Sequence, residues 1–377
     1  MDLSLSEEQQ LLRDSAARVV RDHGGVERRR ALRQHTLGYD PALWQEFAAL
    51  GWLALPFAEA DGGLGGSVQD LAILMEQMGR GLIASPFLPA IVVCGALLAA
   101  ADATQRAEHL SPLLEGKAQW AFACAEPAGG VDLKDVQLRA QMVDGGFVLD
   151  GAKIAVLNGH AADWIILSAR TAGARRDAVG ISLFIVAANT PGLARRPVVL
   201  VDGSRGAHLE LTGVRVREQA LLGPLNGGMA LLDEALARAS VAMGAEALGA
   251  MEALLEQTVA YSLTRVQFGK PIGSFQALQH RMAQMYLQCE ALRSLLCHAA
   301  IAQDEKRADA AQAAAAVKVK LGEAGRFVSQ QAVQIHGGIG MTDELAVSHY
   351  FRRLMLLNTL FGDAEHHLGR YLDLDLG

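Results

Sequence analysis

An acid- and histidine-rich stretch near the C-terminal end is the first candidate for chemistry. Residues 357–371 read LNTLFGDAEHHLGRY, which places four ionisable side chains after a glycine: Asp363, Glu365, His366 and His367. Carboxylates and imidazoles act as general acids and bases and as metal ligands. Asp363 and His367 lie one helical turn apart, but neighbouring histidines on a helix point in different directions. We therefore interpret Asp363 as a helix N-cap, Glu365 as a first-turn acid, and the histidines as surface or interface residues.

Two further stretches carry a different chemistry, RVQFGKPIGSFQALQ (residues 265–279) and QAVQIHGGIGMTDE (residues 331–344). The planar fork of Arg265 suits a phosphate, and Phe268 offers an aromatic face beside a glycine. The Gly337–Gly338 pair lets a bulky ligand approach the backbone closely. Together these motifs could hold a nucleotide diphosphate, although each alone also fits a helix end with a solvated arginine. The sequence contains neither a dinucleotide-binding GxGxxG after a strand nor a P-loop.

The composition indicates a large folded protein. The chain has 377 residues, of which 51% are hydrophobic and 20% charged, so two or three subdomains are expected. A net charge of −7 argues against a nucleic-acid or membrane-surface binder. The four cysteines form no CxxC pair, and the start MDLSLSEEQQ is acidic and polar. These features favour a reduced cytoplasmic protein without a secretory signal.

One uncharged stretch, residues 81–101, is long enough to span a bilayer. Pro86 and Pro89 interrupt it, and the unbroken part from Ala90 has the length of a buried helix. We therefore predict a buried helix and no membrane segment.

The elements that must position these residues follow an α–β–α order. The first third is helical: Ser6 and Gln9 form a capping box, WQEFAALGWLAL is an amphipathic segment ended by Pro56, and QDLAILMEQMGRGL is a further helix. From about Gln119 the chain consists of short β-branched runs separated by turns, which predicts an all-β domain, a sandwich or barrel.

Long helices return after residue 223. Met229 to Leu263 is one, Ser274 is a candidate N-cap for a second, and a third ends at Gly337–Gly338. Helices of this length with short connections predict an antiparallel four-helix bundle.

The motifs, taken in this order and layout, resemble the acyl-CoA dehydrogenase family over essentially the whole chain. The run R-x-x-F-G-x-P-I-G-x-F-Q carries the resemblance, and Q-x-x-G-G-x-G supports it. The resemblance implies an N-terminal α-helical domain (residues 1–117), a central β-domain (118–222) and a C-terminal four-helix bundle (223–377). It also implies FAD, an acyl-CoA substrate, a glutamate that removes the α-proton while a hydride moves to the flavin, and an electron-transferring flavoprotein as reoxidant.

The chain departs from this family at the catalytic base. The family's E-G-T matches Phe361, Gly362 and Asp363, and a phenyl ring cannot accept a proton. The alternative base position, on the first long helix of the bundle, falls at Ala239. The resemblance therefore implies no catalytic residue in this chain.

Two other acids are candidates to replace the missing base. Glu246 lies two helical turns beyond Ala239, and we interpret it as a core or interface acid. We interpret Glu126 as a residue that orders its loop.

The β-domain departs from the family as well. The family's flavin loop T-E-P-G-A-G-S-D reads AEPAGGVD here, residues 125–132, and the flavin-facing W-I-T reads Ala155–Val156–Leu157. Each lost hydroxyl removes a hydrogen bond worth about 0.5–1.5 kcal/mol. We therefore expect weak FAD binding by this domain.

The contacts that in the family reach the FAD of a neighbouring subunit match well. The predicted cofactor-binding residues are Arg265, Gln267, Phe268, Phe275, Gln334, Ile335, Gly337 and Gly338. Our hypothesis is that the chain shares FAD with a partner, as the non-base subunit of a heteromer. Its ending, its AEADGGLGG loop and its RTAGARRD stretch look similar to small subunits of the pimeloyl-CoA dehydrogenase type.

Two alternatives stay open at this point. One is a homomeric flavoenzyme with monooxygenase-like chemistry, which needs no α-proton base. The other is a purely structural subunit. The family forms dimers and tetramers through the C-terminal bundle, so the resemblance implies a dimer or tetramer with itself or with a second acyl-CoA dehydrogenase subunit.

Overall fold

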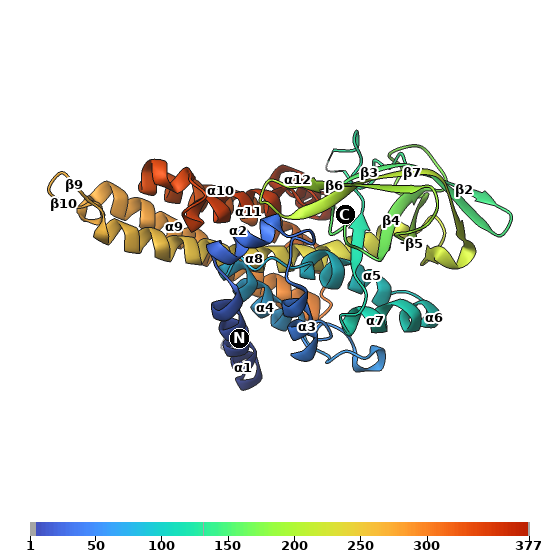
Figure 1. The fold of residues 1–377 in the computed structure, drawn as a ribbon, viewed down its shortest axis with the longest axis horizontal. Coiled ribbons are helices and arrows are strands. Elements are labelled where there is room, and N and C mark those ends of the chain that lie inside the picture. Colours follow the sequence, from blue (N-terminus) through green and yellow to red (C-terminus); the bar gives the residue numbers. More distant parts are fainter. Residues whose placement is uncertain (1–4, 131, 376–377) are drawn as a thin grey trace. The chain divides into compact units, whose positions relative to one another are not determined.

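A computed structural model describes residues 5–130 and 132–375 of the chain. Met1–Ser4, part of the stretch that predicts no secretory signal, and Val131 of the predicted flavin loop lie outside the described residues. The chain divides into two compact units. The helical unit comprises Met1–Ala31, Ser67–Ile83 and Ser240–Gly377, and the β-unit comprises Leu32–Gly66 and Ala84–Ala239. Figure 1 labels their elements.

Two capped helices begin the helical unit. Helix α1 (Glu7–His23) starts at Ser6, whose hydroxyl accepts from the Gln9 N–H while the Gln9 side chain accepts from the Ser6 N–H. The predicted capping box is therefore confirmed. Helix α4 (Val68–Arg80) begins with an equivalent box between Ser67 and Asp70, so both helix starts are set by local sequence.

Five helices follow in the C-terminal part of the chain. They are α8 (Gly228–Thr264), α9 (Gln276–Asp304), α10 (Ala310–His336), α11 (Ala346–Thr359) and α12 (Ala364–Asp375). Helix α10 contacts α9, α11 and α12, and Gly244 of α8 lies against Leu296 of α9 and Val317 of α10. The predicted helical C-terminal region is confirmed. The boundary between the two units falls within α8.

The predicted N-cap of the second long helix is wrong. Ser274 lies in a 3-10 turn (Ile272–Ser274), and its hydroxyl donates to the carbonyl of Pro271. Phe275 occupies the cap position of α9 without a side-chain hydrogen bond. Serine hydroxyls bond to nearby backbone in turns as well as at helix starts, so the serine alone did not distinguish the two.

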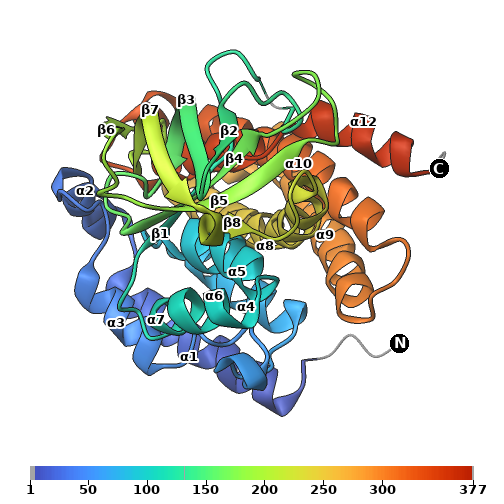
Figure 2. The same cartoon turned by 90° about the vertical axis from the view of Figure 1, so that its right-hand side faces the viewer.

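The β-unit contains one hydrogen-bonded sheet in the order β6-β7-β3-β2-β4-β5-β8, with β1 paired parallel to β4 (Figure 2). The strands are β1 (Trp120–Ala123), β2 (Arg139–Val143), β3 (Gly146–Leu157), β4 (Trp164–Arg170), β5 (Ile181–Ala187), β6 (Leu193–Val199), β7 (Arg205–Arg217) and β8 (Leu221–Leu222). Strands β2 and β4 meet at a single residue pair, Arg139 and Arg170. The two parts of the sheet can therefore turn toward each other.

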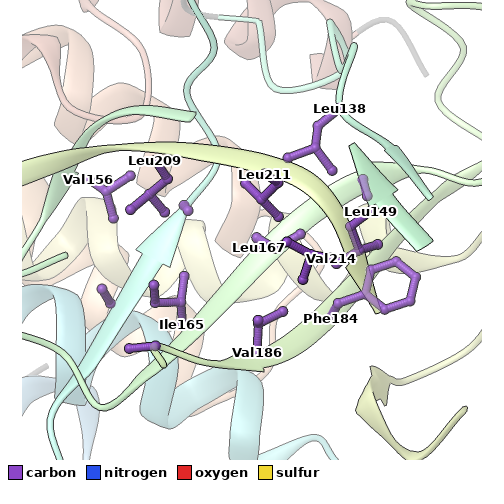
Figure 3. Close-up of a cluster of buried hydrophobic side chains, with 14 of the residues drawn as sticks. Leu138, Leu149, Val156, Ile165, Leu167, Phe184, Val186, Leu209, Leu211 and Val214 are labelled. Carbon is purple, nitrogen blue, oxygen red and sulfur yellow. The ribbon is translucent and has the colours of Figure 1, made fainter. Parts of the chain in front are cut away.

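Buried side chains from both parts of the sheet form one core. Figure 3 shows side chains of β3 and β7, such as Val156 and Leu211, packed with side chains of β4 and β5, such as Ile165 and Val186. All four are almost completely buried. This is the inward-facing core that the sandwich prediction required.

Short helices complete the β-unit. They are α3 (Pro41–Ala49), a π-helical segment (Leu88–Gly95), α5 (Ala96–Ala99), α6 (Ala103–Gln105), a second π-helical segment (Arg106–Leu110) and α7 (Ser111–Leu114). Helix α3 ends at Ala49 and not near Pro56, because Gly51 takes a positive φ of 75° and the chain enters turns there. Every residue of Leu88–Gly95 is buried, as predicted. Within the described residues, no helix has the length and apolar character needed to cross a membrane.

Helices α4 and α8 approach each other through two glycines. A Cβ added at Gly79 would lie 1.9 Å from the Glu246 carbonyl oxygen, and one added at Gly249 would lie 1.8 Å from the Glu76 carbonyl oxygen. Neither backbone can yield without moving its helix. The close contact therefore depends on both positions lacking a side chain.

Alanine at either glycine should force the helices apart. We expect Gly79→Ala and Gly249→Ala each to lower the free energy of unfolding by about 1–3 kcal/mol, as overpacking does. Urea denaturation followed by circular dichroism measures the change. Gly369→Ala on α12 is the matched control, because nothing lies within 4 Å of a Cβ added there. Equal stability of all three variants would contradict the close-contact account.

Candidate functional site

The turn after α11 contains Phe361, the position at which the resemblance places the family's catalytic base. Phe361 has a positive φ of 56° and Gly362 one of 103°, so the chain reverses direction between α11 and α12. Asp363 caps α12, since its Oδ1 accepts from the His366 N–H at 3.0 Å. The N-cap interpretation of Asp363 is therefore confirmed. The residue at the base position is held in a strained turn but carries only a phenyl ring.

A buried lysine forms hydrogen bonds to the backbone carbonyl groups of this turn. Lys318 of α10 is fully buried, and its Nζ donates to the carbonyl oxygens of Leu357 at 2.8 Å, Asn358 at 3.1 Å and Leu360 at 2.9 Å. These carbonyls belong to the last turn of α11 and the residue after it, where a helix leaves its acceptors unpaired. Burial lowers the pKa of Lys318 to about 7, although the Asp363 carboxylate opposes the shift.

His367 of α12 also contacts the backbone of this turn. Its Nε2 lies 3.0 Å from the carbonyl oxygen of Phe361, to which it can donate. Burial, and secondarily the charge of Lys318, lower the pKa of His367 to about 4. The prediction that both histidines lie at the surface is wrong for His367, which is 5% exposed. Its neighbour His366 is half-buried and contacts it edge-on.

The polar residues of this stretch therefore serve the turn and not a reaction. Among the described residues, no group of three or more His, Cys, Asp or Glu side chains is placed to hold a metal ion. The lysine that organises the turn was missed by sequence reasoning. Its signal was available, because Lys318 lies at helical spacing from Ala314 and Leu321 in an otherwise apolar stripe.

The two acids considered as replacements for the base, Glu246 and Glu126, also form hydrogen bonds and ion pairs within the fold. Glu246 receives a bidentate pair from Arg353, with Nε–Oε1 at 2.6 Å and Nη2–Oε2 at 2.9 Å, and both side chains are largely buried. It is therefore the core acid we expected. Ala239, the alternative base position, is completely buried.

Glu126 orders its loop in the β-unit, as expected. Its carboxylate accepts from the N–H groups of Gln137 at 2.7 Å and Leu138 at 3.1 Å. It also pairs with Lys153 at 2.7 Å, and both side chains are almost fully buried. The loop's one charged side chain near Pro127 thus points inward and is unavailable to a ligand.

Two backbone N–H groups in the predicted flavin-ring segments donate to other groups of the β-unit. The Ile154 N–H donates to the Ala125 carbonyl at 2.9 Å, and the Ala155 N–H donates to His208 Nδ1 at 3.1 Å. Ala155 takes a positive φ of 51°, and Val156 is buried in the core. Flavin rings require hydrogen-bond donors and acceptors along one edge. The described residues of this cradle do not fit that requirement.

The predicted residues of the helical unit are arranged differently. After α8, Arg265 leads into a two-stranded hairpin of β9 (Val266–Gln267) and β10 (Lys270–Pro271) that projects past the helix ends (Figure 1). Phe268 at its tip is 90% exposed. Its ring meets that of Phe275 edge-on at 6.1 Å, and the Lys270 Nζ lies 4.4 Å above the Phe275 ring. An exposed phenyl ring on a short hairpin is suited to contact with another molecule.

The end of α10 lies beside the last turns of α8, which precede this hairpin. Tyr261, one turn before Arg265, stacks on His336 with ring centroids 4.3 Å apart. Gly337 takes a positive φ of 69°, and nothing lies within 4 Å of a Cβ added there or at Gly338. Ile335 is buried, so its side chain is not available to a ligand. The backbone of this run is therefore open to a ligand.

This second set of residues has free hydrogen-bonding groups. Within the described chain, the Arg265 guanidinium and the side-chain amides of Gln267 and Gln334 lack hydrogen-bond partners, and all three are exposed. A guanidinium, two amides and an open glycine backbone suit a diphosphate. The set therefore fits part of an FAD molecule, whereas the β-unit cradle does not fit the flavin ring.

Sequence comparison assigns the whole chain. Models of the acyl-CoA dehydrogenase N-terminal, middle and C-terminal domains match residues 6–117, 121–214 and 226–372. The probable acyl-CoA dehydrogenase YngJ of Bacillus subtilis is 31% identical over 378 residues, covering 97% of each chain. The chain belongs to the acyl-CoA dehydrogenase family, a family of FAD-binding oxidoreductases that act on acyl-CoA, and its predicted fold is confirmed.

Solved structures agree. The ChsE4-ChsE5 complex of Mycobacterium tuberculosis matches with a TM-score of 0.88 and 28% identity, covering 100% of this chain and 99% of that one. The FAD complex of PigA matches with a TM-score of 0.90 and 26% identity, covering 100% of both chains. The chain is thus similar to a chain of a two-component complex and to a protein solved with FAD.

The buried His367 predicts a pH dependence of stability. Its folded pKa of about 4 lies below the ordinary 6.5, so between these values the unfolded chain binds a proton that the folded chain does not. Its contribution should be complete above pH 6.5 and lost as pH falls toward 4, by at most about 1.4 kcal/mol per pH unit. Urea denaturation across this range gives the free energy of unfolding as a function of pH. Its slope should be shallower for His367→Gln than for the wild-type chain, and glutamine keeps a donor for the Phe361 carbonyl. An unchanged slope would contradict the burial of this imidazole.

Proposed function

We propose that this chain is the non-base, small subunit of a heteromeric acyl-CoA dehydrogenase. It supports the α,β-dehydrogenation of an acyl-CoA thioester with FAD as hydride acceptor, and the FAD is shared with a partner subunit. The observation that carries the proposal is Phe361, which stands at the family's base position in a fully formed turn. The acyl chain is not specified by any residue on which the proposal rests.

The uneven quality of the two flavin contact sets supports a shared site. In the β-unit, the Glu126 carboxylate accepts from two backbone N–H groups, and the N–H groups of Ile154 and Ala155 donate within the unit. Among the described residues, the side chains of Arg265 and Gln334 in the helical unit have no hydrogen-bond partner, and both are exposed. Exposed donors without a partner are expected when they complete a site whose remainder lies on another chain. The ChsE4-ChsE5 complex supplies a precedent for two different chains on this fold.

Each retained residue has a defined task in the proposed site. Arg265 would pair with phosphate oxygens through its fork, and Gln267 and Gln334 would donate amide hydrogen bonds. Phe268 would exclude water from one side of the cofactor, and the Gly337–Gly338 backbone would allow close approach. When bound, FAD supplies the two-electron acceptor for the substrate's hydride. Proton removal from the α-carbon falls to the partner's base.

Further features follow from the family and belong to the same proposal. The domains are residues 1–117, 118–222 and 223–377, and the chains assemble as a dimer or tetramer through the C-terminal bundle. An electron-transferring flavoprotein reoxidises the flavin. The enzyme acts in the cytoplasm on a fatty or dicarboxylic acyl-CoA.

Two other functions remain distinguishable from this one. A homomeric, monooxygenase-like flavoenzyme requires the β-unit to bind the flavin of its own chain. This is disfavoured because the N–H groups of Ile154 and Ala155 already donate within the β-unit. A purely structural subunit requires that the exposed residues of the hairpin make no difference to the flavin of the complex. The next experiment separates these cases.

Residues of the hairpin should control flavin retention by the complex. Co-expression with a partner acyl-CoA dehydrogenase chain that keeps the catalytic glutamate gives the test sample. We expect Arg265→Ala to weaken FAD binding roughly tenfold to a hundredfold, because a charge-assisted hydrogen bond of about 1.5–3 kcal/mol is lost. Phe268→Ala should act in the same direction. Flavin absorbance during stepwise dilution measures retention.

Arg217→Ala is the matched control, because Arg217 is an exposed arginine at the end of β7, outside the predicted set. It should leave flavin retention unchanged. Unaltered flavin in the Arg265 and Phe268 variants would favour the purely structural subunit and contradict the proposal.

A further inference from the structure

A hollow lies on the outer face of the β-unit sheet, over the neighbouring strands β6, β7 and β3. Its volume is about 740 Å³. Its lining includes neither the flavin-facing segment Ala155–Leu157 nor any predicted cofactor-binding residue. Leu209 and Leu211 of β7 point into the core (Figure 3). His208 and Glu210 alternate with them along the strand and therefore face the hollow.

The strand register determines the neighbours of these two side chains. Glu210 pairs with Ala152 of β3 on one side and with Ala194 of β6 on the other. Methyl groups on both sides of a carboxylate leave space that longer side chains would fill. His208 pairs with Arg196 of β6. The hollow therefore has small side chains around its carboxylate, and a guanidinium group beside an imidazole one step further along the strands.

The backbone determines which nitrogen of His208 carries the proton. Strand β3 has a bulge between Lys153 and Val156, opposite His208, and the Ala155 N–H there donates to His208 Nδ1 at 3.1 Å. A neutral imidazole that accepts at Nδ1 carries its proton on Nε2. Among the described residues, this Nε2–H has no acceptor. It can therefore donate to a ligand in the hollow.

The charged groups of the hollow are not paired with each other. Arg196 and Glu210 are exposed, and within the described chain neither forms an ion pair or a side-chain hydrogen bond. The other two cations in the lining are already bound. Arg195 donates to backbone carbonyl groups after β3, and the buried Lys153 pairs with Glu126. A ligand would thus meet one unpaired guanidinium group, one imidazole N–H and one unpaired carboxylate.

We propose that this hollow binds a small zwitterion with a carboxylate at one end and an ammonium group at the other. The carboxylate accepts from Arg196 and from His208 Nε2, and the ammonium group donates to Glu210. His208 and Glu210 are two residues apart on one strand, which separates the two ends by about 6.5 Å. An extended ω-amino acid such as 5-aminopentanoate has about this length. The site is independent of the flavin contacts of the helical unit.

Titration of the full-length chain with 5-aminopentanoate tests the site. Isothermal calorimetry should show saturable binding of one equivalent. The amide resonance of Ala155 should shift during the titration, because this N–H is bonded to His208. Pentanoate, which lacks the ammonium group, should bind about tenfold more weakly. Pentylammonium should bind more weakly still, because Arg195 and Arg196 line the hollow against the single unpaired carboxylate of Glu210.

Substitutions at the two ends of the site should have different effects. Glu210→Gln should weaken the binding of 5-aminopentanoate about tenfold without weakening that of pentanoate, whereas Arg196→Gln should weaken both about tenfold. Arg215→Gln is the matched control, because Arg215 is an exposed arginine of β7 that does not line the hollow. It should change either affinity by less than about twofold.

A variant that fills the hollow completes the test. Ala194→Phe places a ring beside Glu210 from the exposed edge strand β6, and should abolish binding while circular dichroism shows an intact fold. Three results would overturn the proposal: no saturable binding, equal affinity for 5-aminopentanoate and pentanoate, or undiminished binding by Ala194→Phe. The last result decides the matter even where Glu210→Gln fails to fold.

Discussion

A single buried ammonium group determines the shape of the turn on which the functional account depends. Lys318 gives three hydrogen bonds to the end of α11 and receives no carboxylate within salt-bridge distance among the described residues. Placing a charge in such surroundings is costly, and the lowered pKa reflects that cost. The arrangement persists because the alternative, a helix end with unpaired buried carbonyls, costs free energy as well. The turn is therefore intact although it carries Phe361 and no carboxylate at the position of the family's base.

The other ionisable groups that first suggested catalysis are likewise bound into the fold. Glu246 is held by Arg353, and Glu126 by Lys153 and two backbone N–H groups. These contacts hold both carboxylates inside the fold, so neither is placed to contact a substrate. By contrast, the Arg265 guanidinium, exposed just after α8, has no hydrogen-bond partner among the described residues. Acids turned inward and hydrogen-bond donors turned outward support the proposal of a subunit that completes a site on another chain.

Sequence reasoning succeeded where the cause is local. Ser6 and Gln9 cap α1 through bonds that span three residues, and Asp363 caps α12 in the same manner. The family resemblance predicted the fold correctly. Reasoning failed where a distant partner decides. The role of Lys318 depends on the end of a helix about 40 residues further along the chain. His367 in turn lies near Lys318, in addition to its contact with the nearby Phe361 carbonyl. Ser274 failed for a different reason, since two local hydrogen bonds were open to it.

The central claim is that this chain cannot retain flavin by itself. The most direct measurement is the flavin content of the purified chain alone, compared with that of the chain co-purified with its base-bearing partner, together with acyl-CoA oxidation by each. The account predicts a colourless, inactive chain alone and a flavin-containing, active complex. A yellow isolated chain that oxidises an acyl-CoA would contradict it.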